Sequence, residues 1–276
     1  MAMSVNTNQA ALVALQNLNK TNMSLGDVQN RISTGLAINS AKDNASVWAI
    51  AQGQRADIGS LAAVKMSLDR AKSISDVAST AGSSISDLLV QMKEKVVAAM
   101  DPSIDSTSRT ALDSDFKSIL RQIIQVTQNA NFDGANLLDG SINPGIKFIA
   151  NADATGFITL STQNMSLGGS LISVASTASL GTITFATAIL AQLSTSITNV
   201  NAALGNLGSQ ATQIENHAAF VAKLTDQLNT GVGNLVDADL AKESARLQAL
   251  QVQQQLGAQA LSIANQAPQI ILQLFK

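Results

Sequence analysis

The residues that could carry catalysis or bind metal are few in this chain of 276 residues. His217 is the only histidine and cysteine is absent, which leaves no His-Glu-x-x-His zinc motif, no thiolate metal site and no thiol nucleophile. A Ser-His-Asp triad would have to use His217, but this residue stands beside Ala218 in a long pattern typical of a helix. We therefore interpret His217 as a packed or half-exposed helix residue, and the sequence argues against an enzyme.

Two other groups resemble fragments of binding motifs. Asp237, Asp239 and Glu243 could suggest a cation site, but they lack the glycine of an EF-hand loop, and Asp237 suits the cap of a helix that follows. Gly231 and Gly233 lack the third glycine and the preceding strand of a nucleotide-binding loop, so a flexible joint is the simpler interpretation. We expect no metal and no cofactor.

Trp48 and a Ser/Thr-rich run from residue 170 to 187 remain open to two interpretations each. Trp48 could be a ligand platform, but a lone tryptophan beside a helix start is more often a packing anchor. The hydroxyl-rich run is either a polar loop or an O-glycan acceptor, with Ser173, Ser176 and Thr177 as its candidate positions.

Charge and hydropathy exclude two classes of partner. Net charge is −2 and no cluster of Lys and Arg suits phosphate groups, so we expect no nucleic acid. No stretch approaches the roughly 18 apolar residues of a membrane span, and we expect no membrane insertion. The first residues lack a basic segment followed by an apolar run, so no secretory signal peptide is expected. These rules predict a cytosolic protein unless a route without a signal peptide exports it.

The longest regular pattern covers residues 190–228. Apolar residues alternate at intervals of three and four, and only Thr225 breaks the rule. A strict seven-residue repeat predicts a helix that keeps one seam against partner helices, here about 58 Å long. Between Lys147 and Glu215 the only charge is Asp153, which indicates faces covered by neighbours or by other copies. The seam residues of this predicted rod are Leu193, Ile197, Val200, Leu204, Leu207 and Ile214.

Two further ladders, meaning rows of mainly apolar residues at alternating intervals of three and four, lie within residues 61–99 and 112–130. Together the three segments predict an elongated coiled-coil helical bundle, and a compact globular all-α domain is the alternative. Glycine becomes frequent after residue 139, and the runs 146–149 and 157–160 flank a turn, which predicts a β-hairpin. The expected fold class is therefore mainly α with a small β-hairpin insertion.

Both ends of the chain carry patterns that resemble bacterial flagellins of the short kind, with almost no variable outer region. The amino-terminal pattern includes Ser4-Val-Asn-Thr-Asn8, Arg31-Ile-Ser-Thr-Gly35 and Ile38-Asn-Ser-Ala-Lys-Asp-Asn44. The carboxy-terminal pattern includes Val236-Asp-Ala-Asp239 and Ala264-Asn-Gln-Ala-Pro268. The resemblance covers all but the middle of the chain.

The resemblance implies that the terminal helices pair as an antiparallel coiled coil lining the core of a helical filament. The expected domains are an inner domain of residues 1–45 and 233–276, a rod-like domain of residues 46–140 and 185–232, and an outward insertion of residues 141–184. Inner coiled-coil contacts are expected at Leu15, Leu18, Leu25, Ile32, Leu240, Leu247, Leu250 and Leu261.

The resemblance further implies polymerisation with itself and with sister flagellins, contacts with hook-associated and cap proteins, and an export chaperone on the carboxy-terminal helix. It implies an extracellular filament, reached through the flagellar type III apparatus without a cleaved signal peptide. Gln91 stands where many flagellins have an arginine recognised by an innate Toll-like receptor, which puts that recognition in doubt.

We therefore expect a structural subunit that polymerises into the flagellar filament for motility. A hook-filament junction protein, which shares similar terminal helices, is the alternative within the same class. A secreted coiled-coil binding protein, such as an adhesin or effector, is the alternative from another class, and it would never polymerise.

Overall fold

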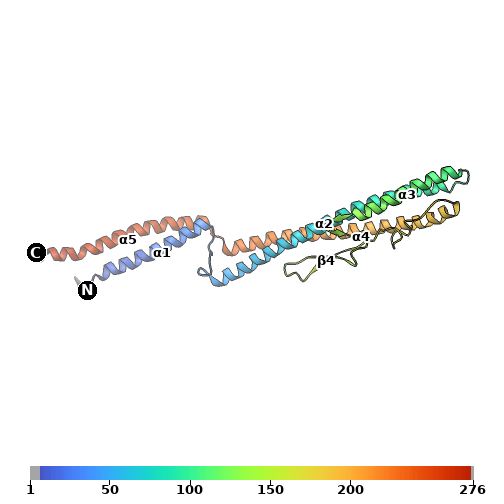
Figure 1. Ribbon diagram of the computed structural model, residues 1–276. Helices are drawn as coiled ribbons and strands as arrows, with labels where there is room; N and C mark the ends of the chain where they lie inside the picture. The colour runs from blue at the N-terminus through green and yellow to red at the C-terminus, as the bar shows by residue number, and fades with distance from the viewer. Residues whose placement is uncertain (1–6, 275–276) are drawn as a thin grey trace. The chain divides into compact units, whose positions relative to one another are not determined.

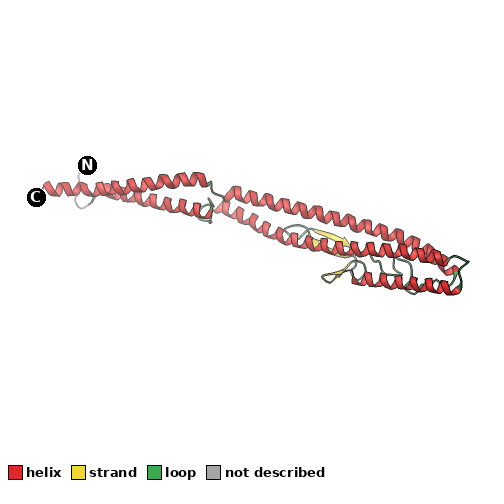
Figure 2. Ribbon diagram, turned by 90° about the horizontal axis from the view of Figure 1, so that it is seen from above, coloured by secondary structure: helices red, strands yellow, loops and turns green. Residues whose placement is uncertain are grey.

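The protein is described by a computed structural model that covers residues 7–274, with side chains described for residues 7–266. Its five helices are α1 (Gln9–Thr34), α2 (Ala45–Ala99), α3 (Ser106–Asn129), α4 (Ile183–Val236) and α5 (Leu240–Leu274), as Figure 1 shows. Four short strands follow α3, and helix dominates the chain in Figure 2. The mainly-α fold with a small β insertion is confirmed.

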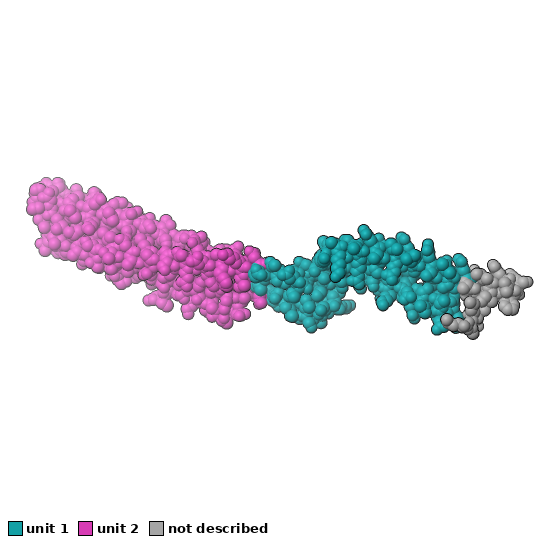
Figure 3. Space-filling view, turned by 180° about the vertical axis from the view of Figure 1, so that it is seen from behind, with its two compact units in different colours: residues 1–56, 227–276 teal, residues 57–226 magenta. Residues whose placement is uncertain are grey.

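The chain divides into two compact units, coloured separately in Figure 3. Unit 1 comprises residues 1–56 and 227–276, and unit 2 comprises residues 57–226. Both boundaries fall inside helices, because α2 and α4 each contribute residues to both units.

Local signals set most of the helix ends. Asp105 caps α3 by accepting a hydrogen bond from the Ser108 amide, and Asn44 accepts one from the Val47 amide at the start of α2. Helix α2 ends at Ala99, just before the Asp101-Pro102 step. These caps and the proline step are local features of the sequence.

Helix α4 continues through the expected flexible joint, so that prediction is wrong. The helix includes Gly231 and Gly233 and ends at Val236, where the Asp237 amide donates to the Gly233 carbonyl. Val232 and Val236 are buried, and this packing offsets the cost of about 1 kcal/mol that each helical glycine carries relative to alanine. A Cβ at Gly233 would lie 2.7 Å from Asp237 Oδ2, so the glycine permits a close approach.

In unit 2, α2 and α4 run antiparallel. Lys72 pairs with Glu215 at 2.7 Å and Ser86 donates to Asn201 at 3.1 Å, so partner numbers fall along α4 as they rise along α2. Lys95 pairs with Asp115 of α3 at 2.8 Å. The predicted ladder of α2 forms the core, and its buried members are Leu61, Val64, Leu68, Ala71, Ser75, Ala78, Ile85, Leu89, Met92, Val96 and Ala99.

Two hairpins lie between α3 and α4. β3 (Gly145–Ile149) pairs with β4 (Phe157–Ser161) in antiparallel register, which confirms the predicted hairpin. β1 (Asn131–Phe132) also pairs with β2 (Ala135–Asn136), a hairpin that the sequence interpretation missed. Its Asp133-Gly134 turn has φ of 50° and 79°, and the Asp-Gly step was the available signal.

By length and composition alone, α4 could cross a membrane, and it is the one helix in the described part of the chain with this property. Its apolar residues Leu193, Val200 and Leu207 are fully buried within unit 2. The core helix of a helical bundle can have the same composition, and the burial of these three residues is consistent with that role.

Candidate self-assembly surfaces

Polar caps fix the ends of the helix pair in unit 1. Asn8 accepts a hydrogen bond from the Ala11 amide at the start of α1, and Gly35, with φ of 72°, ends that helix in the left-handed region. Asp239, not the expected Asp237, caps α5 by accepting from the Ala241 and Lys242 amides. Asp237 instead forms a β-bridge with Leu36, which joins the segments that follow α1 and α4.

Helices α1 and α5 pack against each other in antiparallel orientation. The Asn8 side chain donates to the Ala264 carbonyl at 2.7 Å, Gln254 donates to Asn22 at 2.8 Å, and Arg31 lies 3.4 Å from Glu243. Residue numbers therefore fall along α5 as they rise along α1, which defines one register for the pair.

A strict heptad seam runs along α5. Between residues 243 and 264, the side chains that are not exposed follow one another at intervals of four and three, and every residue between them is exposed. This is the pattern of a helix with one partner along a supercoiled seam. The seam consists of Glu243, Leu247, Leu250, Gln254, Gly257, Leu261 and Ala264.

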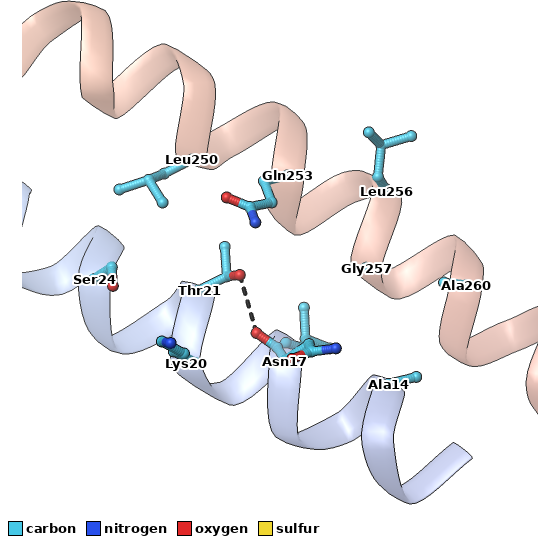
Figure 4. A pocket seen from close by; sticks show the side chains of 11 residues that line it. Ala14, Asn17, Lys20, Thr21, Ser24, Leu250, Gln253, Leu256, Gly257 and Ala260 are labelled. Carbon is cyan, nitrogen blue, oxygen red and sulfur yellow. Dashed lines mark hydrogen bonds between the residues drawn. The ribbon is translucent and has the colours of Figure 1, made fainter. Parts of the chain in front are cut away.

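The α1 side of the seam uses many small and polar residues. The ladder with the same spacing consists of Ala11, Ala14, Leu18, Thr21, Leu25, Val28 and Ile32, of which Thr21 and Val28 are buried. The Thr21 hydroxyl donates to the Asn17 carbonyl at 3.0 Å, which satisfies it inside the helix (Figure 4). A groove of about 540 Å³ remains between the two helices here, lined in part by Ala14, Gln253 and Ala260.

Gly257 allows a close approach of Leu18 in this seam. A Cβ added there would lie 3.3 Å from Leu18 Cδ1 and 3.8 Å from Leu18 Cβ. The glycine therefore fits the leucine, and a larger residue would displace it.

Of the eight expected inner contacts, the structure places six on the seam and two off it. Leu250 is buried, while Leu18, Leu25, Ile32, Leu247 and Leu261 are half-buried. Leu15 and Leu240 are 42% and 49% exposed and lie outside the ladder. The seam positions that we missed, such as Thr21, Gln254 and Gly257, carry no apolar signal; only their heptad spacing could have shown them.

A second apolar stripe on α5 stays open. Val252, Leu256 and Ile263 are 56%, 59% and 68% exposed, and each follows a seam residue by two positions. Two residues correspond to about 200° around a helix, so this stripe lies almost opposite the seam. Figure 4 shows Leu256 pointing away from α1. Helix α1 likewise exposes Leu12, Val13, Leu15 and Met23.

The predicted rod seam lies inside unit 2. Leu193, Val200, Leu207 and Ile214 are buried, and Ile197 and Leu204 are half-buried. A Cβ at Gly82 of α2 would lie 2.7 Å from Leu204 Cδ2, which shows how closely α2 and α4 approach.

His217 anchors the β3–β4 hairpin. Its Nε2 lies 2.6 Å from the Ala150 carbonyl oxygen, so Nε2 carries the proton and donates. Gln210, two turns earlier on α4, accepts from the Ser161 amide, and Ser67 of α2 accepts from the Ile149 amide. The only histidine is therefore a structural residue that holds the insertion on the helices.

The candidate glycan acceptors lie just before α4 and are all exposed. The Ser173 amide donates to the Ser196 hydroxyl at 3.1 Å, and its own hydroxyl lies 3.4 Å from the Gln192 carbonyl. Ser176 and Thr177 lie in the turn that follows.

Buried Asp113 ties the segment before α4 to α3. Its Oδ1 accepts from the Leu180 amide at 2.7 Å and the Ser179 hydroxyl at 2.9 Å, and Lys117 lies 2.7 Å from its Oδ2. Burial acts to raise the pKa of this carboxyl, but the hydrogen bonds from Lys117, Leu180 and Ser179 outweigh it and lower the pKa below its ordinary value.

No group of three or more His, Asp or Glu residues is placed to hold a metal ion within the part of the chain that the structure describes. The candidate contact surfaces of unit 1 are the α1–α5 seam and the exposed apolar residues around it.

Comparisons with known proteins agree with this architecture. The model of the bacterial flagellin N-terminal helical region matches residues 5–143, and that of the bacterial flagellin C-terminal helical region matches residues 190–275. Flagellin FljJ of Caulobacter vibrioides is 55% identical over 100% of this chain and 99% of its own length. Four other flagellins of that organism are 47–49% identical over 99% of this chain.

Among solved structures, the crystal structure of Bacillus cereus flagellin is similar with a TM-score of 0.50 and 21% identity, covering 56% of this chain and 88% of that one. A structure described as a flagellar hook-associated protein of Vibrio parahaemolyticus gives 0.55 and 12%, covering 71% and 100%. At these identities the structures support the fold alone, whereas the five full-length relatives named above are flagellins. The chain thus belongs to the bacterial flagellin family, the structural subunits of the extracellular flagellar filament.

Proposed function

We propose that copies of this chain polymerise through the second apolar stripe of α5, while the α1–α5 seam holds each subunit's terminal helices together. The observation that carries this proposal is that α5 has two apolar stripes almost opposite each other. One stripe covers α1, and the other exposes Val252, Leu256 and Ile263.

An open stripe of this kind favours a helical polymer over a closed dimer. Exposed leucine and isoleucine side chains gain roughly 1.5–3 kcal/mol each when they become buried. The exposed residues of α1, Leu12 and Leu15 among them, differ from the α5 stripe, so α1 and α5 offer two unlike surfaces. Contacts between unlike surfaces repeat without closing and generate a fibre.

The proposed domains follow the sequence boundaries: residues 1–45 with 233–276 form the inner, core-lining part, residues 46–140 with 185–232 form the rod, and residues 141–184 face outward. The exposed terminal helices would require cover before assembly, which suits an export chaperone on α5. Export without a cleaved signal peptide, co-assembly with sister flagellins and contacts with hook-associated and cap proteins belong to the same proposal, as does a purely structural role without catalysis.

Ser173, Ser176 and Thr177 are the proposed O-glycan acceptors, because their side chains are exposed within the insertion. Mass spectrometry of peptides from native filaments tests this modification. Unmodified peptides across residues 170–187 would contradict it.

Seeded polymerisation tests the proposed assembly surface. Leu256→Asp places a charge on the open stripe at a residue that is not a member of the seam ladder. We expect it to raise the critical concentration about tenfold for each 1.4 kcal/mol lost. Gln255→Asp adds the same charge at an exposed position of the same turn that belongs to neither stripe. Negative-stain microscopy and sedimentation measure the fibres.

The expected result is long fibres from the unaltered chain and from Gln255→Asp, and few or none from Leu256→Asp. Normal fibres from Leu256→Asp would rule out the second stripe as the contact. An unaltered chain that stays monodisperse on seeds would contradict polymerisation itself and favour the junction protein or a secreted binding protein.

A further inference from the structure

The ion pair between Arg31 and Glu243 has an unusual environment. Glu243 is the only charged member of the α5 seam ladder, and its side chain is only 10% exposed. One carboxylate oxygen, Oε1, lies 3.4 Å from Arg31 Nη1, while Oε2 is buried and has no partner among the described residues. No other ion pair joins α1 to α5 in the part of the chain that the structure describes.

This geometry stabilises the helix pair poorly. A single contact of 3.4 Å is long for a charged hydrogen bond, and the buried Oε2 has lost its water without gaining a donor. Apolar residues of similar size in place of a buried ion pair are often neutral or stabilising. The pair therefore needs an explanation other than stability.

Register supplies that explanation, because the spacing of the ladder by itself would also fit after a slip. The Leu36–Asp237 bridge and the Asn8–Ala264 and Gln254–Asn22 hydrogen bonds favour the same register as the ion pair. Members of the seam alternate leucines with Ala14, Thr21, Gln254 and Ala264, and a heptad repeat returns a similar face after a shift of seven residues. Such a shift moves one helix about 10 Å along the other. On slipping, Leu18 would leave its place against Gly257, and Glu243 would leave Arg31 and remain buried without a counter-ion.

Correct register matters if the assembly proposed above is right. The open stripe of α5 and the exposed leucines of α1 form two contact surfaces on one helix pair. A slip of about 10 Å would move these surfaces apart by two helical turns. We propose that Arg31 and Glu243 are positioning residues that select the single α1–α5 register in which both surfaces match the next copy; this inference rests on the proposed function.

Disulfide trapping reads the register directly, because the chain has no native cysteine. The Leu18 Cβ lies 3.8 Å from the position of a Cβ at Gly257, close to the mean separation in disulfides of about 3.8 Å. Leu18→Cys with Gly257→Cys therefore reports the observed register, and Leu18→Cys with Ala264→Cys reports a slip of one heptad.

Both cysteine pairs are placed in three backgrounds: the unaltered chain, Arg31→Met with Glu243→Leu, and the control Lys72→Met with Glu215→Leu. The control removes an ion pair of unit 2 whose side chains are about half exposed. Oxidised glutathione forms the disulfides, both in free subunits and after seeded assembly, and non-reducing electrophoresis measures them.

In the unaltered and control backgrounds we expect only the Leu18–Gly257 pair to cross-link. With Arg31 and Glu243 replaced, we expect the slipped pair to rise at least fivefold, while circular dichroism shows no loss of helix. Exclusive cross-linking at Gly257 in all three backgrounds would overturn the inference, as would an unaltered chain that cross-links at neither position. Because trapping reads free subunits as well, these outcomes are distinguishable from a failure to polymerise.

Discussion

The two helix seams of this protein differ in how completely a single chain buries them. In unit 2, the seam of α2 is closed: Leu68, Ile85, Leu89, Met92 and Val96 have no exposed surface. In unit 1, the seam of α5 is mostly half-buried and leaves a second apolar stripe open. Unit 2 therefore closes the seam of α2 within one chain, whereas unit 1 leaves a row of apolar residues on α5 exposed, which we propose other copies cover.

The largest loss of stability is expected from a substitution in the closed seam of α2. Leu89→Ala removes a fully buried side chain and should lower the free energy of unfolding by about 2–5 kcal/mol. Val90→Ala, at a neighbouring residue that is 47% exposed, is the matched control and should cost far less. Urea denaturation followed by circular dichroism measures both, and equal losses would break the contrast between core and surface.

The half-buried seam of α5 should respond to a buried charge in a different way. Leu250→Asp puts an unpaired carboxylate at the most buried leucine of the α5 seam, so we expect an exported subunit that does not assemble. Because Leu250 lies in unit 1, the cooperative unfolding of unit 2 should not change. Filament length on cells and the melting curve of secreted subunits check the two parts, and filaments of normal length would refute the role of the seam.

A smaller effect concerns the anchor at Asp113. Asp113→Ala leaves the buried Leu180 amide without its acceptor and should destabilise unit 2 by about 1–3 kcal/mol. The control Asp115→Ala removes an exposed carboxylate paired with Lys95 and should cost less than about 1 kcal/mol. Urea denaturation at neutral pH checks both variants.

Acid should remove the difference in stability between Asp113→Ala and the unaltered chain. The pKa of Asp113 is lower in the folded chain, so its contribution to stability is complete above the unfolded value of about 3.9 and disappears as the pH falls through the folded value. The gap between Asp113→Ala and the unaltered chain should therefore close in that acidic range. A gap that persists at lower pH would show that ionisation of Asp113 does not matter.

The periodic parts of both units could be predicted from the sequence because they depend on local and repeating signals. The ladder of α2 is buried even at Ser75 and Gly82, where the apolar rule fails, and Asp105 caps α3 through a local side-chain hydrogen bond. Positions along a seam are buried because of their spacing, whatever the residue type. The spacing therefore predicts the buried positions more reliably than residue type does.

The wrong predictions relied on the type of a residue, although the residues that pack against it decide its role. Leu15 and Leu240 are apolar but lie off the seam, since α1 and α5 carry apolar residues on more than one face. Gly231 and Gly233 suggested a joint, but Val232 and Val236 pack and keep α4 helical. The hairpin anchors Ser67, Gln210 and His217 depend on contacts between distant segments, which no local pattern reveals.

The smallest change in stability is expected at two helical glycines, one in unit 2 and one in unit 1. A Cβ at Gly205 of α4 would meet nothing within 4 Å, whereas a Cβ at Gly257 of α5 would lie 3.3 Å from Leu18. Gly205→Ala should therefore stabilise unit 2 by about 0.5–1 kcal/mol, because alanine favours the helix and no neighbour has to move. Gly257→Ala gains the same helix propensity but pushes Leu18 outward, so its net effect on the subunit should be near zero or unfavourable. Thermal denaturation followed by circular dichroism compares the two. If both substitutions stabilised the chain equally, the α1–α5 seam would be looser than the approach of Leu18 to Gly257 indicates.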